Sequence, residues 1–185
     1  LKRLPRMALA LASEACRGVP PGDAPQAVCL GTAWGALSET HDFLQRLFET
    51  RQQFPSPTDF VGSVHNAPAG QVAMHLGARG ANVTTSGGDA SFEQALLAAD
   101  LLTDRPDQPV LVLGVDEGHP SLAPLLDNSV RGAPLADGGG ALLLRRGRPS
   151  EPTISLLAYR CDSGPHAVQA LLEAAGGAQQ VRSSV

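Results

Sequence analysis

The sequence predicts an α/β fold, because helical and strand patterns alternate along its 185 residues. The clearest strand is the apolar run at 110–115 (VLVLGV), which suits a buried strand. The clearest helix carries Phe92, Ala95, Leu96 and Ala99, which recur at helical spacing. Aromatic residues make up only 4% of the chain, so we expect the core between these layers to consist of small and aliphatic side chains.

The first part of the chain alternates in the same way. The expected elements are a helix over 4–17, a buried strand over 27–33, an amphipathic helix capped by Ser38 or Thr40, and a loop over 52–59. The first helix ends at Gly18 and the prolines that follow it, and Pro55 and Pro57 predict the loop. Phe43, Leu44, Leu47 and Phe48 give the amphipathic helix an apolar face.

The second part continues the alternation. The expected elements are a helix over 67–76 capped by Asn66, a strand over 81–85, a helix capped by Asp89, the strand over 110–115, a loop or short helix over 121–131, strands over 141–144 and 153–159, and a helix over 166–175. The three glycines at 138–140 lack the Lys-Ser/Thr and helix of a phosphate-binding loop, so they are interpreted as a tight turn. The small polar tail from Gly176 is expected to fray.

Composition excludes several classes of function. The net charge of −4 and the isoelectric point near 5.7 argue against nucleic acid as a partner. The sequence has three cysteines without metal-ligand spacing, which fits a reducing, cytoplasmic compartment and predicts no metal and no cofactor. No apolar run approaches the roughly 20 residues of a membrane helix, so no membrane insertion is expected. The opening Leu1-Lys2-Arg3 is not an ordinary start and suggests a trimmed N-terminus.

Four segments in a fixed order carry a resemblance. They are Ser56-Pro57-Thr58-Asp59-Phe60 with Ser63-Val64-His65-Asn66-Ala67, Thr84 through Ser91, Val110 to Val115, and Asp137-Gly138-Gly139-Gly140-Ala141-Leu142-Leu143-Leu144. The order and spacing resemble the β-ketoacyl synthase-like N-terminal domain family of the thiolase-like superfamily. Members of this group occur as short proteins beside aryl polyene and other fatty-acid or polyketide-type genes.

The resemblance implies a thiolase-like layered α-β-α-β-α fold, of which this chain supplies the N-terminal half only. It divides the chain into an N-terminal ketosynthase-like domain at 4–145 and a short continuation at 146–185, which resembles the start of the second half. It also implies dimerisation through the strand near 81–85, which leads into the turn where an active enzyme carries its nucleophile.

Condensation in this family requires a cysteine thiolate at the start of a helix, backbone N–H groups that hold the oxyanion, and two polar side chains, usually histidines. Matching the helix without gaps places Gly88 at the position of the nucleophilic cysteine, and glycine has no side chain to acylate. A slip in the alignment offers Gly87 or Ser86. Ser86 is a weak candidate nucleophile, because the sequence shows no adjacent base, and a hydrogen bond to the backbone of its turn is the simpler interpretation.

Other chemistry-bearing residues have simpler structural interpretations. His41 and His119 are expected to be solvated, and His65 is expected to make a structural hydrogen bond rather than to catalyse. Asp116-Glu117 is interpreted as a polar strand end. The remaining residues of this kind are His75, His166, the structural or incidental Cys16, Cys29 and Cys161, and the solvated basic cluster Arg145-Arg146-Gly147-Arg148.

The leading hypothesis is a ketosynthase-like subunit without the nucleophilic cysteine, which acts as a non-catalytic, chain-length-factor-like partner in fatty acid, aryl polyene or polyketide biosynthesis. Its partners would be an active ketosynthase subunit or a second copy of itself, and an acyl carrier protein. Two alternatives stay open: an acyltransferase or hydrolase that uses Ser86, and a scaffold module that binds the carrier protein.

Overall fold

The structure is a computed structural model that describes residues 2–49, 51, 56–103, 108–147, 166–177 and 179. The chain divides into two compact units, Leu1–Arg146 and Gly147–Val185. In the second unit the described residues form one helix, α7 (Ala167–Ala174), in which no residue is buried. The first unit contains the sheet and its core.

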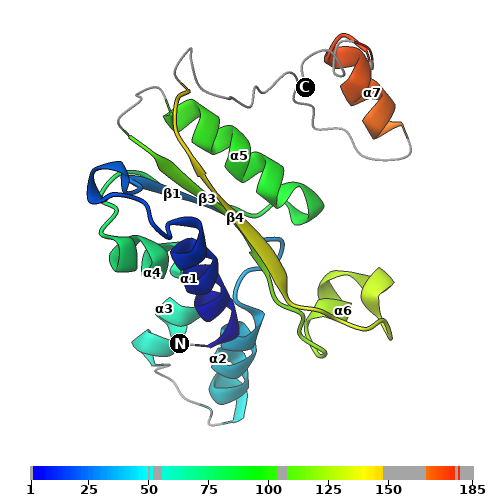
Figure 1. Ribbon diagram of the computed structural model, residues 1–185. Helices are drawn as coiled ribbons and strands as arrows, with labels where there is room; N and C mark the ends of the chain where they lie inside the picture. The colour runs from blue at the N-terminus through cyan, green and yellow to red at the C-terminus, as the bar shows by residue number, and fades with distance from the viewer. Residues whose placement is uncertain are drawn as a thin grey trace. The chain divides into compact units, whose positions relative to one another are not determined.

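A four-stranded sheet organises the first unit (Figure 1). Its strand order is β2 (Asn82–Thr85), β1 (Ala27–Gly31), β3 (Val110–Asp116) and β4 (Gly138–Leu144). β1 runs parallel to both β2 and β3, with Cys29 opposite Val83 on one side and Val112 on the other. β4 is antiparallel to β3. The carboxyl ends of β1, β2 and β3 therefore meet at one edge of the sheet.

Helices cover both faces of this sheet (Figure 1). α1 (Arg3–Ala15) and α4 (Ala67–Leu76) pack on one face, and α5 (Ser91–Leu102) packs on the other. The two cores consist of small and aliphatic side chains, as the composition predicts. They are Leu4, Ala8, Ala12, Val28, Leu30, Ala36, Ala69, Val72, Leu111, Leu113 and Val115 on the α1 side, and Ala27, Cys29, Ala95, Ala99, Val110 and Val112 on the α5 side.

One further long helix and several short elements complete the unit. They are α2 (Leu37–Glu49), α3 (Pro57–Ser63), α6 (Ala123–Leu126) and the 3₁₀ turns η1 (Pro21–Asp23), η2 (Gly88–Ala90) and η3 (Asn128–Val130). Figure 1 shows that α2 and α6 lie beyond the end of the sheet rather than on its faces. The expected strand over 153–159 and the tail beyond 179 lie outside the described residues.

The interpretation of 138–140 as a tight turn is wrong, because all three glycines belong to β4 and pair with the end of β3. The packing of β4 explains at least one of them. A Cβ on Gly139 would lie 2.5 Å from the carbonyl oxygen of Gly114 and 2.8 Å from Cδ1 of Leu11. Glycine is therefore required where α1 and β3 approach β4 closely.

Three local expectations also require correction. Residues 57–59 of the predicted loop belong to α3 (Pro57–Ser63), because Ser56 caps the helix by accepting a hydrogen bond from the Asp59 N–H and Pro57 takes the first turn. Asn66 precedes α4 without a side-chain capping bond. Asp89 lies within the 3₁₀ turn η2, so α5 begins only at Ser91.

Candidate functional site at the carboxyl edge of the sheet

The loop after β1 is held by the carboxylate that ends β3. Oδ1 of Asp116 accepts hydrogen bonds from Oγ1 of Thr32 and from the Ala33 N–H, both at 2.8 Å. Oγ1 of Thr32 in turn accepts the Gly35 N–H at 3.1 Å. This loop lies at the carboxyl edge, where open α/β sheets bind their ligands, and Asp116 fixes its shape.

The turn after β2 is closed by hydrogen bonds of its own. Oγ of Ser91 accepts the Gly87 N–H at 2.9 Å and donates to the Gly88 carbonyl oxygen at 2.6 Å. Oγ of Ser86 donates to the Ala33 carbonyl oxygen at 3.1 Å. Within the described residues no histidine or carboxylate bonds the Ser86 hydroxyl, so the geometry gives it a backbone partner and no base to activate it.

Gly88 has the backbone conformation that favours glycine, with φ +60°, and it lies on the exposed side of the turn. A Cβ placed there would meet no atom within 4 Å. The position thus has room for a side chain but carries none. At Gly87 a Cβ would instead meet the amide of Gln94 at 2.5 Å. Of the three candidate positions Ser86, Gly87 and Gly88, only Ser86 has a side chain that could act as a nucleophile.

Glu117, the residue after β3, is buried in a network of polar contacts. Its Oε1 accepts the Ser38 N–H at 2.6 Å, and its Oε2 accepts the Ser38 hydroxyl at 3.0 Å. Nε of Arg3 lies 3.4 Å from Oε2, and the same guanidinium donates to the Gly118 carbonyl oxygen at 2.6 Å. Only 1% of the Glu117 surface is exposed, so this carboxylate joins the starts of α1 and α2 to the end of β3.

Sequence reasoning missed this network. It interpreted Asp116 and Glu117 only as a polar strand end and assigned Ser38 as a possible helix cap. α2 begins one residue earlier, at Leu37, and Ser38 bonds Glu117 across a separation of 79 residues. An uninterrupted apolar strand followed by two acids is the one signal that could have indicated structural carboxylates at this edge.

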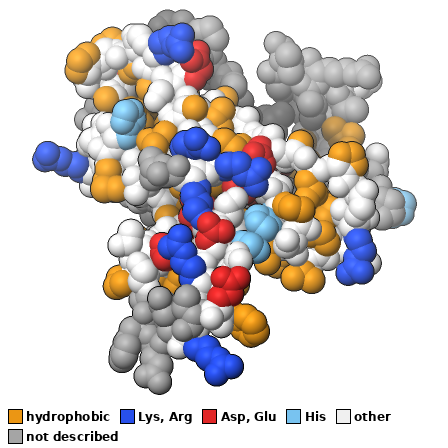
Figure 2. Space-filling view, turned by 90° about the horizontal axis from the view of Figure 1, so that it is seen from below, with side chains coloured by type: hydrophobic (Ala, Val, Ile, Leu, Met, Phe, Trp, Pro, Cys, Tyr) orange, Lys and Arg blue, Asp and Glu red, His pale blue; other side chains and the backbone are white. Residues whose placement is uncertain are grey.

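His41 and His119, which the sequence predicts to be solvated, are only partly exposed. Both are half-buried, and their rings stack with centroids 4.6 Å apart. Burial, together with the nearby His41, lowers the pKa of His119. Two adjacent histidine side chains are visible in Figure 2, beside a band in which basic and acidic side chains alternate.

The other described histidines occupy different places. His65 packs against Gly35, where φ is +70° and a Cβ would lie 2.8 Å from Cδ2 of the ring. His75 is exposed in the last turn of α4, and His166 precedes α7 in the second unit. None of the three bonds the Ser86 hydroxyl in the described part of the chain.

The described cysteines are unsuited to nucleophilic chemistry. Cys29 is fully buried in β1, and burial raises its pKa to about 11. Burial also raises the pKa of Cys16, at the end of α1. Cys161 lies outside the described residues. Among the described residues no group of three or more His, Cys, Asp or Glu side chains could hold a metal ion.

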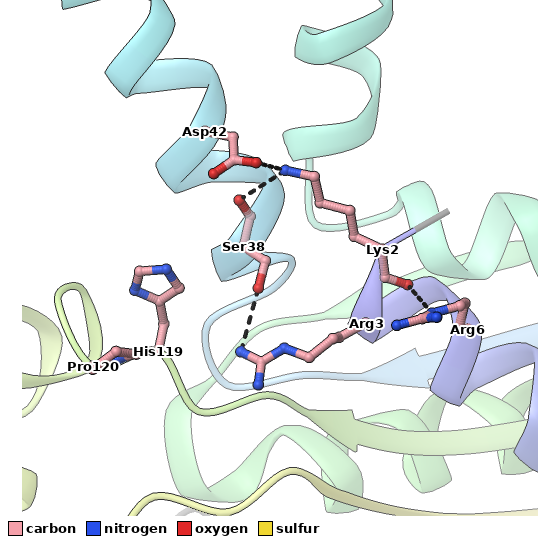
Figure 3. Close-up of a pocket in the computed structure, with 7 residues that line it drawn as sticks. All are labelled: Lys2, Arg3, Arg6, Ser38, Asp42, His119 and Pro120. Atoms are coloured by element: carbon pink, nitrogen blue, oxygen red, sulfur yellow. Dashed lines mark hydrogen bonds and ion pairs between the residues drawn. The ribbon is translucent and has the colours of Figure 1, made fainter.

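An open pocket of about 470 Å³ adjoins the Glu117 network. It is lined by Lys2, Arg3, Arg6, Ser38, Asp42, His119 and Pro120 (Figure 3). Lys2 forms an ion pair with Asp42, and Arg3 pairs with Glu117 and with Asp137 at 3.2 Å. The positive charge in this pocket is therefore mostly balanced by neighbouring carboxylates.

The model of the β-ketoacyl synthase N-terminal domain matches residues 1–181. The chain belongs to this family. No curated protein sequence matches it.

Solved ketosynthase structures share its thiolase-like fold. One is the complex of the ketosynthase ApeO with its chain length factor ApeC from Xenorhabdus doucetiae, with 24% identity and a TM-score of 0.66 over 95% of this chain and 69% of that one. The ishigamide ketosynthase/chain length factor gives 23% identity and a TM-score of 0.66 over 82% of this chain. A β-ketoacyl synthase from Burkholderia phymatum STM815 gives 19% identity and a TM-score of 0.57 over 69%.

The chain spans 45% of the ishigamide protein and 33% of the Burkholderia enzyme, so it corresponds to the N-terminal half of the fold. In the part of the chain that the structure describes, no helix is long and apolar enough to cross a membrane.

Proposed function

We propose that this chain is a non-catalytic, chain-length-factor-like partner of a cysteine-bearing ketosynthase in fatty acid, aryl polyene or polyketide biosynthesis. The observation that carries this proposal is the turn after β2, where Gly88 has an exposed backbone, free space and no side chain. Ser86, the nearest hydroxyl, donates to a backbone carbonyl group. A protein with this turn cannot hold an acyl chain at Gly88 and needs a partner that can.

The structural matches support a partner of this kind. Two of the similar solved structures are named for a ketosynthase together with a chain length factor. In such an assembly this chain would shape the cavity where the partner extends the acyl chain, and the partner would receive that chain from an acyl carrier protein. We place this activity in the cytoplasm, in agreement with the cysteine content.

The free edge of the sheet gives the partner a place to pair. β2 is an edge strand, and on the side away from β1 no described strand covers it. The carbonyl oxygens of Ala81 and Thr85 accept hydrogen bonds from the segment that contains β1. Successive residues of a strand direct their backbone N–H and C=O groups to opposite sides, so those of Thr84 point away from β1, toward the free edge. The hydroxyl of Thr84 is buried without a partner in the described structure. An added strand would satisfy such an edge.

Co-expression with a ketosynthase of the same pathway tests the proposal. We expect a stable heterodimer whose mass is measured by size-exclusion chromatography with light scattering. Thr84→Pro removes the outward N–H and should abolish the complex, whereas Thr84→Val keeps that N–H, deletes only the unpartnered hydroxyl and should preserve it. If the chain never associates with a ketosynthase, or if both variants bind equally well, the proposed pairing is wrong.

Product analysis separates this proposal from a scaffold that only binds the carrier protein. A chain-length-factor-like partner sets product length, so its deletion should change the lengths of the acyl products. Unchanged lengths would favour the scaffold. An acyltransferase or hydrolase that uses Ser86 would instead lose its activity in Ser86→Ala.

A further inference from the structure

We propose that His119 is an acid-sensitive cap that holds the start of the segment 119–131 in place only while its imidazole is neutral. This segment joins β3 to β4 and contains α6 and η3. Its base is fixed independently of His119, because the Gly118 N–H donates to Asp137 at 3.0 Å. The imidazole acts on the turn between His119 and Ala123.

Nδ1 of His119 serves as the acceptor for this turn. The N–H groups of Ser121 and Leu122 both donate to it at 3.3 Å, and the Ala123 N–H donates to the His119 carbonyl oxygen at 2.9 Å. The imidazole can accept at Nδ1 only in the neutral tautomer that carries its proton on Nε2. Protonation of Nδ1 would remove the acceptor and would point a new N–H at the N–H groups of Ser121 and Leu122.

The surroundings of the ring disfavour the cation. The ring is half-buried, and it stacks on His41 of α2 at 4.6 Å. Burial lowers the pKa of His119 most, His41 and Arg3 lower it further, and Glu117 opposes them. Oε1 and Oε2 of Glu117 are already bonded to Ser38. Titratable and charged groups face the ring from several elements. They are Lys2 before α1, Arg3 and Arg6 in α1, His41 and Asp42 in α2, Glu117 after β3, and Asp137 before β4.

The sign of the pH effect follows from this. A histidine whose pKa is lower in the ordered state than in the open state stabilises the ordered state above the ordinary pKa near 6.5. That contribution is lost as the pH falls through the lowered value. Acidification therefore releases the turn that precedes Leu125 and Leu126, whose side chains are 75% and 56% exposed. Opening of this turn lets Leu125 and Leu126 change position at the carboxyl edge of the sheet.

Asparagine provides a matched variant, because its Oδ1 can accept the same N–H groups but does not titrate between pH 5 and 8. We would measure hydrogen exchange of the Ser121, Leu122 and Ala123 amides by NMR from pH 7.5 to 5.5, corrected for intrinsic rates. In the wild type we expect the opening constant to rise over this range, with an upper limit of about tenfold that is set by the ordinary histidine pKa near 6.5. His119→Asn should show no such rise, and His119→Ala should be open at every pH.

The imidazole ¹⁵N shifts report the tautomer directly, without a substitution. A neutral ring with the proton on Nε2 at pH 7.5 is the expected result. A proton on Nδ1 at that pH, an opening constant that does not change with pH, or the same acid response in His119→Asn would each overturn the proposal.

Discussion

The ends of β2 and β3 lie at the same edge of the sheet but differ in how they use polar groups. The turn after β2 has a glycine with free space and a hydroxyl that donates to a backbone carbonyl group. At the end of β3, Asp116 and Glu117 together accept four hydrogen bonds from the loop after β1 and the start of α2. At the first end Gly87 and Gly88 carry no side chain and the Ser86 hydroxyl bonds the backbone, whereas the ionisable groups of the second end are already used to hold the fold.

This difference shows why two acids at a strand end need not be an acid–base pair. A catalytic carboxylate must reach a substrate. Glu117 is buried and bonded through both of its oxygens, and Asp116 holds a loop. Stability measurements on the two ends should therefore separate them clearly.

The largest effect is expected at Glu117. Glu117→Ala leaves the N–H and the hydroxyl of Ser38 without their acceptors and removes one of the two carboxylates that pair with Arg3, so the free energy of unfolding should fall by about 3 kcal/mol in urea titrations. Glu117→Gln, which keeps one acceptor oxygen, should lose less. The exposed Glu14, paired with Arg17, is the control, and Glu14→Ala should change stability by less than about 0.5 kcal/mol. Equal effects at Glu14 and Glu117 would contradict the structural role.

Asp116 should follow. Asp116→Ala removes the acceptor for Thr32 and Ala33 and should lower the free energy of unfolding by about 2 kcal/mol. Asp116→Asn retains an oxygen in that place and should lose clearly less. A loss in Asp116→Asn as large as in Asp116→Ala would mean that the charge, rather than the acceptor geometry, stabilises this loop.

A smaller effect is expected at Gly88. Gly88→Cys should cost about 1–2 kcal/mol, because φ is +60° although space is available. The new thiol should react with iodoacetamide at pH 8, while Cys29, whose pKa is raised to about 11, should not. Mass spectrometry of alkylated peptides distinguishes the two. A new thiol as unreactive as Cys29 would show that the turn is closed rather than exposed.

Ser86 should show the smallest effect. Ser86→Ala removes one exposed hydrogen bond to a carbonyl group, so the free energy of unfolding should change by less than about 0.5 kcal/mol. Product formation by the assembled pair should not change. Loss of acyl transfer in this variant alone would support the alternative enzyme and exclude a silent role for this turn.

The sequence predicted much of the fold because local patterns determine it. The apolar run at 110–115 became β3, and the spacing of Ala95 and Ala99 predicted the buried side of α5. The errors occur where distant segments decide the outcome. Gly139 of β4 is required by the close approach of the Gly114 backbone and of Leu11 from α1, and α3 depends on a cap at Ser56, which lies between Pro55 and Pro57 in the sequence.

The candidate site divides in the same way. The sequence alone shows that position 88 is a glycine without a side chain. The strand-to-helix pattern predicts a turn there, and the structure has an exposed turn in which Gly88 takes the left-handed conformation. Glu117 contacts Ser38 and Arg3, and His41 contacts His119. The two residues in each of these contacts are about 80 or more positions apart in the sequence. No local pattern encodes such contacts, so only the assembled fold reveals them.

Intact-mass spectrometry after incubation with acyl-carrier thioesters tests the central claim most directly. The chain would be measured alone and in the presence of a cysteine-bearing ketosynthase of the same pathway. The account predicts no acyl adduct on this chain in either sample and an adduct on the ketosynthase cysteine in the second. An acyl adduct on this chain alone, mapped to Ser86 or to a cysteine, would contradict it.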